Sequence, residues 1–201
     1  MTRAGWRNFA IVAVAGGLLI GLLEAFLRSR GVEPSAYTRL AFVPVVAVLG
    51  LSAAMLAGNR KERGADPGAR AAALTGQPEP GAARLIVHRQ GFVGKALGVD
   101  VRIDGAFAAQ LKSPRFTAVD VPPGRHRVEA AMTREGSMQN EDGAVELELA
   151  EGETVAVAVS LKMGALRNRA ELAAGPVDEA LRRKLAGVRM VASEWKAAAF
   201  V

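Results

Sequence analysis

Residues 145–163 read VELELAEGETVAVAVSLKM, and this stretch decides the fold of the C-terminal part of the chain. Apolar Val, Leu and Met alternate with Glu, Ala, Ser and Lys on both sides of the pair Glu151-Gly152. A period of two is typical of a β-strand that buries one face. The Glu-Gly pair supplies turn chemistry between the two alternating runs. The stretch therefore predicts two consecutive strands joined by a tight turn.

The same alternation recurs from residue 84 onward, with turn residues between the runs. Asp104-Gly105 predicts a two-residue hairpin, and Asp142-Gly143 precedes another strand. Short antiparallel strands at this spacing predict an all-β antiparallel sandwich over residues 84–173. Seven or eight strands are expected, over residues 84–90, 99–104, 106–112, 115–121, 125–132, 144–150, 153–163 and, as the eighth, 165–172.

Residues 119–131, VDVPPGRHRVEAA, hold the most site-like side chains of this domain. Pro123-Gly124 suits a type II turn, because proline fixes φ and glycine accepts a positive φ. His126 follows the turn, and the chain's second histidine is His88. Without cysteines or a spaced carboxylate cluster, neither a metal shell nor a catalytic base with its nucleophile is indicated. We therefore predict a turn followed by a structural histidine.

Three segments of this domain carry a family resemblance: GVDVRIDGAFAAQL (98–111), FTAVDVPPGRHRVEAAM (116–132) and VELELAEGETVAVAVSL (145–161). They resemble the PEGA-type and carboxypeptidase-regulatory-like β-sandwich modules of bacterial envelope proteins, which share a pattern V-x-V-D/N-G … L … V-x-V-P-P-G-x-H-x-V. The likeness covers residues 84–172, and the polar loop 133–142 departs from it. The resemblance implies a non-catalytic surface or interaction module, often outside the cytoplasm.

Two apolar runs precede the strands, at residues 9–27 and 40–57. Each is close to the roughly 20 residues that cross a hydrocarbon core of about 30 Å. Neither alternates polar and apolar faces as a buried core helix does. The first run ends without a small-x-small cleavage site, which disfavours a signal peptide. We therefore predict a transmembrane helical hairpin in residues 1–57, with spans over about 8–27 and 39–57.

Small residues recur along both apolar runs and predict a helix-packing face. In lipid, close approach of backbones through small residues drives helix pairing. This face serves the hairpin itself, self-association or another membrane protein. The single acid in the runs, Glu24, is expected to pair with Arg28 one turn away. The candidate packing residues are Ala13, Gly17, Gly21, Ala25, Gly50 and Ala54.

Basic residues gather around the apolar runs rather than in the strand-rich domain. Residues 1–83 carry 9 Lys/Arg and 5 Asp/Glu, whereas residues 84–201 carry 17 and 15. This distribution argues against nucleic-acid binding, which needs a basic face on the folded domain. Six basic residues flank one side of the hairpin and three the other, which predicts a multi-pass protein of the bacterial inner membrane with a cytoplasmic domain. The periplasmic side is the alternative, favoured by the family resemblance.

Two further segments complete the expected organisation. Residues 58–83 are rich in Pro and Gly with one large aliphatic, and predict a flexible linker. Residues 176–192 predict an amphipathic helix, because Pro176 and two acids begin it, basic residues follow, and apolar residues recur at helical spacing. This helix is expected to pack on the sandwich, with docking on a membrane or a partner as the alternative.

The sequence lacks the motifs of common enzyme and cofactor classes. It has no Gly-rich phosphate loop, nucleophile elbow or metal-ligand spacing, so no enzyme activity, cofactor or metal is expected. We expect a non-enzymatic integral membrane protein that presents a tethered β-sandwich to a protein partner. The alternatives are an envelope module that binds a small ligand or cell-wall glycan, which its few aromatic residues disfavour, and an unrecognised enzyme using His88 or His126.

Overall fold

The computed structural model describes residues 3–33, 35–75, 77–132, 140–162 and 168–196. The chain divides into two compact units, residues 1–58 and 59–201. Each unit is described below by itself. The loop predicted at 133–142 lies mostly outside the described residues, as does the end of the strand predicted to reach residue 163.

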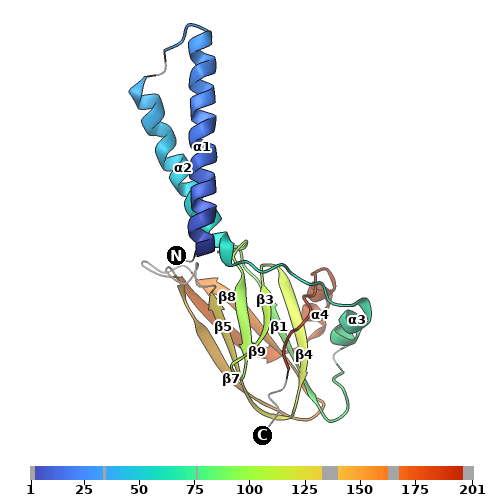
Figure 1. The fold of residues 1–201 in the computed structure, drawn as a ribbon. Coiled ribbons are helices and arrows are strands. Elements are labelled where there is room, and N and C mark those ends of the chain that lie inside the picture. The colour runs from blue at the N-terminus through green and yellow to red at the C-terminus, as the bar shows by residue number, and fades with distance from the viewer. Residues whose placement is uncertain (1–2, 34, 76, 133–139, 163–167, 197–201) are drawn as a thin grey trace. The chain divides into compact units, whose positions relative to one another are not determined.

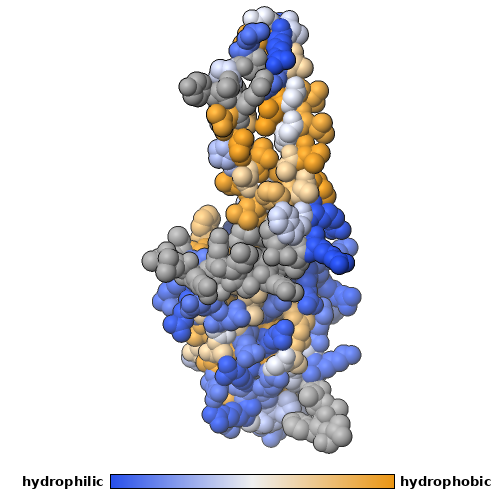
Figure 2. Space-filling model, turned by 60° about the vertical axis from the view of Figure 1, so that its left-hand side comes forward, coloured by the Kyte–Doolittle hydropathy of each residue, from blue (hydrophilic) through white to orange (hydrophobic). Residues whose placement is uncertain are grey.

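The first unit consists of two helices packed side by side (Figure 1). They are α1 (Arg3–Ser29) and α2 (Ala36–Met55), which continues into the short 3-10 helix η1 (Leu56–Gly58). The helices run antiparallel: Asn8, near the start of α1, donates a hydrogen bond to the carbonyl of Ala53, near the end of α2 (3.4 Å). Apolar side chains cover most of the surface of this unit (Figure 2).

The prediction of two transmembrane helices is wrong. Among the described residues, α1 is the one helix long and apolar enough to cross a membrane. The apolar stretch of α2 with η1 is Phe42–Gly58, which falls short of the roughly 20 residues that a span needs. The sequence pattern showed the length of the apolar run but not the residue at which the helix begins. The helix α2 begins at Ala36, and its first turn contains the polar residues Tyr37, Thr38 and Arg39.

The second unit is built from nine strands in the described residues. The first sheet has the order β4-β1-β8-β9-β6, and the second has the order β3-β2-β5-β7. The strands are β1 (Ala83–Arg89), β2 (Val99–Ile103), β3 (Ala106–Leu111), β4 (Arg115–Val121), β5 (Gly124–Met132), β6 (Asn140–Glu141), β7 (Gly143–Leu149), β8 (Thr154–Lys162) and β9 (Asn168–Pro176). The β-rich character that the alternation predicted is therefore present.

The prediction of an antiparallel sandwich is wrong in its pairing. β1 pairs in parallel with β8, and β6 pairs in parallel with β9, so the first sheet is mixed. Glu151-Gly152 does not close a hairpin, because it joins β7 in the second sheet to β8 in the first. Pro123-Gly124 likewise carries the chain from β4 in the first sheet to β5 in the second. Alternation shows which side chains face the core, but the strands of both sheets face the same core. Alternation therefore does not show to which sheet a strand belongs or with which strand it pairs.

The hairpin predicted at Asp104-Gly105 is present between β2 and β3, which pair antiparallel. Asp104 has φ 52° and Gly105 has φ 76°. A type I′ turn requires positive φ at both central positions, and its twist matches that of the flanking strands. Asp and Gly tolerate that conformation at lower cost than other residues. The local sequence thus explains this turn.

The core lies between the two sheets. Val87 and Val157 from the first sheet and Val101 and Val128 from the second are fully buried there. A second apolar cluster covers the outer face of the first sheet, where Ile86 and Phe116 are packed under two helices. These helices are α3 (Pro67–Thr75), which contributes Ala73, and α4 (Glu179–Ala186), which contributes Leu185.

The predicted C-terminal helix over 176–192 is shorter than expected. Asp178 caps α4 by accepting a hydrogen bond from the backbone N–H of Leu181 (2.7 Å), and Gly187 ends the helix. Residues 188–195, here called the closing segment, leave the helix and run along the sandwich. The backbone N–H of Val191 donates to Phe116 of β4 (2.8 Å), and that of Glu194 donates to Ala108 of β3 (2.7 Å). The segment thereby bridges the edge strands of both sheets, and this pairing competes with helix continuation.

The segment predicted as a flexible linker, residues 58–83, is paired with the domain over part of its length. Residues 59–65, here called the strap, lie along the closing segment (Figure 1). The N–H of Ala65 donates to Met190 (3.1 Å), and the N–H of Ala192 donates to Arg63 (2.9 Å). Asp66 then caps α3 through its contact with the N–H of Gly68 (2.8 Å). The domain therefore extends from Asn59 rather than from residue 84.

Candidate functional site

His126, the most site-like residue of the sequence, is engaged through both ring nitrogens. Its Nδ1 lies 2.7 Å from Asp104 Oδ2, and its Nε2 lies 2.7 Å from the carbonyl of Pro122. Asp104 also accepts a hydrogen bond from the backbone N–H of Arg127 (2.8 Å). The ring thus ties the β2–β3 turn to the crossing between the sheets. With neither nitrogen available to a substrate or metal, this geometry supports a structural role.

His88 lies apart from His126, on the outer face of the first sheet. It is buried, and α4 places Lys184 nearby. Burial, and secondarily the positive charge of Lys184, lowers the pKa of His88 to about 4. The residue is therefore neutral at physiological pH. Among the residues that the structure describes, no group of three His, Cys, Asp or Glu side chains lies close enough to hold a metal ion.

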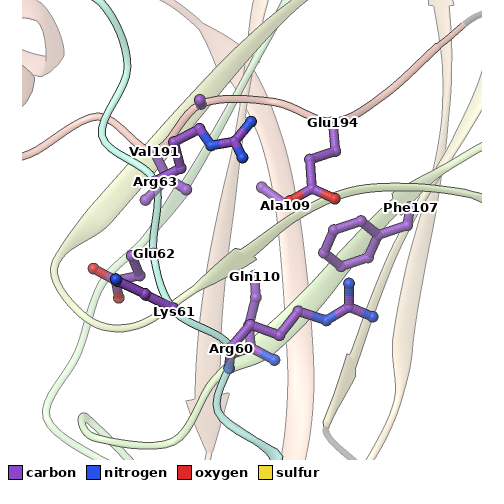
Figure 3. A pocket seen from close by; sticks show the side chains of 10 residues that line it. Arg60, Lys61, Glu62, Arg63, Phe107, Ala109, Gln110, Val191 and Glu194 are labelled. Carbon is purple, nitrogen blue, oxygen red and sulfur yellow. The ribbon is translucent and has the colours of Figure 1, made fainter.

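A small hollow lies where the strap, β3 and the closing segment meet (Figure 3). The Arg60 guanidinium lies over the ring of Phe107, 4.1 Å from its centroid. Glu62 lies 3.5 Å from Lys112 and 3.3 Å from Arg115. The cavity measures about 20 Å³, room for about one water molecule, whereas ligand pockets are typically about 300–1,000 Å³. The hollow is thus part of how the strap is attached and is too small for a metabolite.

The outer face of the second sheet is a stronger candidate. It carries alternating charges from β2, β5 and β7, here called the charged face: Arg102, Arg125, Arg127, Glu129, Glu146 and Glu148. Arg125 is bonded to Glu146 (2.7 Å), and Arg127 contacts Glu129 (2.8 Å) and Glu146 (3.5 Å). A wide, open hollow of about 490 Å³ lies on this face. In the described part of the chain, helices pack on the first sheet, and none packs on this one.

A loop that the sequence did not single out projects an aromatic side chain from the domain. Residues 91–98, here called the Phe92 loop, follow β1, and Phe92 is 86% exposed. Lys95 and Lys184 lie around the same open hollow as Phe92. The sequence did contain a signal, because Phe92 lies in a short run between Gly91 and Gly94, where a core aromatic is not expected.

The structure places some of the candidate helix-packing residues between the two helices and others on the surface of the first unit. A Cβ on Gly50 would lie 2.8 Å from the ring of Phe9, and Ala54 is buried, so both lie between the helices. Gly17 and Gly21 have nothing within 4 Å of such a Cβ, and Ala25 is exposed. Ala13 is half-buried. The close approach from α1 comes instead from Gly16, where a Cβ would lie 2.8 Å from Val46.

Glu24 lies near the C-terminal end of α1, as the sequence suggested. Arg28 Nη2 lies 3.9 Å from Glu24 Oε2, which is the ion pair expected between residues one turn apart.

No family model matches this chain, and the search of curated proteins finds no match either.

Proposed function

We propose that the chain is a membrane-anchored, non-enzymatic protein whose β-sandwich binds a protein partner through the charged face. One observation carries this proposal: the two sheets differ in what covers them. Helices α3 and α4 bury apolar side chains on the first sheet, whereas the second sheet presents Arg and Glu side chains to solvent. Exposed charges of both signs give electrostatic complementarity and specificity with a protein surface.

Helix α1 supports the anchoring part of the proposal. It is 27 residues long and its surface bears large exposed apolar side chains, among them Leu18, Leu19 and Leu22. Such a surface is stable in hydrocarbon and costly in water. Arg3 and Arg7 precede the apolar part of α1 and favour the cytoplasmic face of a bacterial inner membrane for that end of the helix.

The resemblance to PEGA-type modules agrees with a non-catalytic role for the sandwich. The glycan-binding alternative is less well supported. A stacking platform for sugars needs several exposed aromatic rings, yet in the described part of the domain Phe92 is the one exposed Phe, because Phe116 is buried and Phe107 lies under Arg60. Trp195 packs on the core and donates to the carbonyl of Ile103 (3.2 Å).

Site-specific photocrosslinking in native membranes tests the proposal. A photoreactive amino acid at Arg125 should give one discrete protein adduct, and Arg127→Glu should abolish that adduct because it reverses a charge beside the site. The matched control places the photoreactive residue at Lys162 on the first sheet, which is exposed and paired with Glu171 (2.7 Å). Equal labelling from Arg125 and Lys162, or an adduct that survives Arg127→Glu, would contradict the proposed surface.

A further inference from the structure

The Phe92 loop exposes an apolar ring in a domain that otherwise buries such groups. Within the described part of residues 59–201, Phe92 is the one exposed large apolar side chain. Burying a phenylalanine ring is favourable, because it removes a large apolar surface from water. The domain forgoes that stabilisation at this position.

The exposure of Phe92 follows from how its loop is held. The buried guanidinium of Arg89 donates to the carbonyls of Gly94 (2.7 Å), Leu97 and Leu111 (2.9 Å). The N–H of Ser113 donates to the carbonyl of Lys95 (3.2 Å). Burial lowers the pKa of Arg89 to about 10, so the group keeps its charge at neutral pH. These bonds fix the backbone on the domain side and leave the Phe92 ring on the solvent side.

The loop is also tied to the first residue of the domain. Asn59 donates through Nδ2 to the carbonyl of Ala96 (2.9 Å) and accepts through Oδ1 from the N–H of Gly98 (2.7 Å). Asn59 directly follows Gly58, the last residue of the apolar unit. The Phe92 loop is therefore held to the residue that directly follows the apolar unit in the chain.

We propose that the Phe92 loop docks on the surface of the same membrane, with the Phe92 ring at the boundary between headgroups and acyl chains. Lys95 and Lys184 flank the hollow beside Phe92 and would lie at the lipid phosphates. An apolar ring beside lysines is the composition that binds an anionic lipid surface, because the ring partitions and the ammonium groups reach the headgroups. This inference rests on the proposed membrane anchoring and adds a second contact that orients the sandwich.

The absence of cysteine from the chain allows a direct test. The full chain carrying Ala96→Cys is labelled with the fluorophore NBD and reconstituted in phosphatidylcholine vesicles with or without phosphatidylglycerol. Ala96 is exposed, so the label does not disturb the core. The matched control is Glu151→Cys, in the turn between β7 and β8. This turn lies near the start of β1, whereas the Phe92 loop follows the end of β1, so the two labels are about 20 Å apart.

Quenching by doxyl-labelled lipids is the readout. We expect quenching at position 96 to exceed that at position 151 several-fold, to fall to the control level with Phe92→Ser, and to weaken without phosphatidylglycerol. If the chain floats with the vesicles but quenching is equal at the two positions, the contact between the Phe92 loop and the membrane would be overturned, while the anchoring would stand. Phe92 would then be expected to contact a protein partner. A chain that does not float with the vesicles would overturn both the anchoring and this inference.

Discussion

At the scale of single residues, the buried charge of Arg84 is compensated by a defined partner. Arg84 is buried and makes a two-point ion pair with Asp120 (2.6 and 2.7 Å). Its remaining nitrogen donates to the carbonyl of Ala72 at 2.5 Å. Burial alone would raise the pKa of Asp120, but the hydrogen bonds from Arg84 and from the N–H of Glu79 outweigh it and hold that pKa below its usual value. No charge pattern along the chain predicted this pair.

His88 leads to a prediction of pH-dependent stability. Its pKa is about 4 in the folded domain and near 6.5 when unfolded, so the unfolded chain binds a proton that the folded domain excludes. Stability is then fully present above about pH 6.5 and is lost as the pH falls toward about 4, by roughly 2–3 kcal/mol. Urea unfolding of residues 59–201 across this window measures the loss.

The control for this prediction is His88→Gln, which cannot take up the proton. We expect its unfolding free energy to change less than that of the native domain between neutral and mildly acidic pH. Parallel pH profiles for the two proteins would show that other groups cause the loss.

At the scale of elements, α3 and α4 stabilise each other through exchanged arginines. Arg70 of α3 donates to the carbonyls of Ala186 and, at 3.2 Å, Val188 at the end of α4. Arg182 of α4 donates to the carbonyls of Thr75 and, at 3.0 Å, Leu74 at the end of α3. Cations at helix C-termini satisfy unpaired carbonyls and oppose the helix dipole. Neither helix is therefore positioned independently of the other.

This exchange predicts resistance of the strap region to trypsin. Arg70 is held by α4, and the strap is paired with the closing segment, so cleavage after Arg63 and Arg70 in folded residues 59–201 should be slow. Leu185→Asn, which places a polar group in the cluster under α4, should accelerate cleavage after Arg70 severalfold. The exposed neighbour Lys184→Asn serves as the control. Rapid cleavage of the native domain at both sites would instead indicate a flexible linker.

At the scale of the whole molecule, the domain joins distant parts of its chain at one edge. The strap is bonded to the closing segment, and the closing segment is bonded to the edge strands β3 and β4. We predict that deleting 59–65 and deleting 188–201 each destabilise the domain, the latter by roughly 3–5 kcal/mol because Met190 and Val191 are buried. Deleting both should cost less than the sum, since each removes the other's partner.

Urea unfolding of the two single deletions and the double deletion measures this coupling. Strictly additive losses would show that the strap and the closing segment contribute independently.

The strands were predictable because alternation is local, as in β4, whose bounds agree with the expectation. Sheet assignment was not, because Pro123-Gly124 and Glu151-Gly152 have the same composition whether a chain turns back or crosses to the facing sheet. The strap was missed because its pairing with the closing segment is made by backbone groups, and its apolar contact comes from the small residue Ala65. The Phe92 loop was missed because its backbone is held by the side chains of Arg89 and Asn59. No local pattern links these side chains to the loop, and Asn59 also lies far from it in the sequence.

The pairing of Ala192 with Arg63 also sets an order of events during synthesis. The ribosome makes the strap well over a hundred residues before the segment that pairs with it. Contacts so far apart along the chain form slowly, because a large loop must close first. Until then, the edge strands β3 and β4 of the nascent sandwich lack the partner that the closing segment later provides. We expect aggregation to be most severe for chains that stall between these two points of translation.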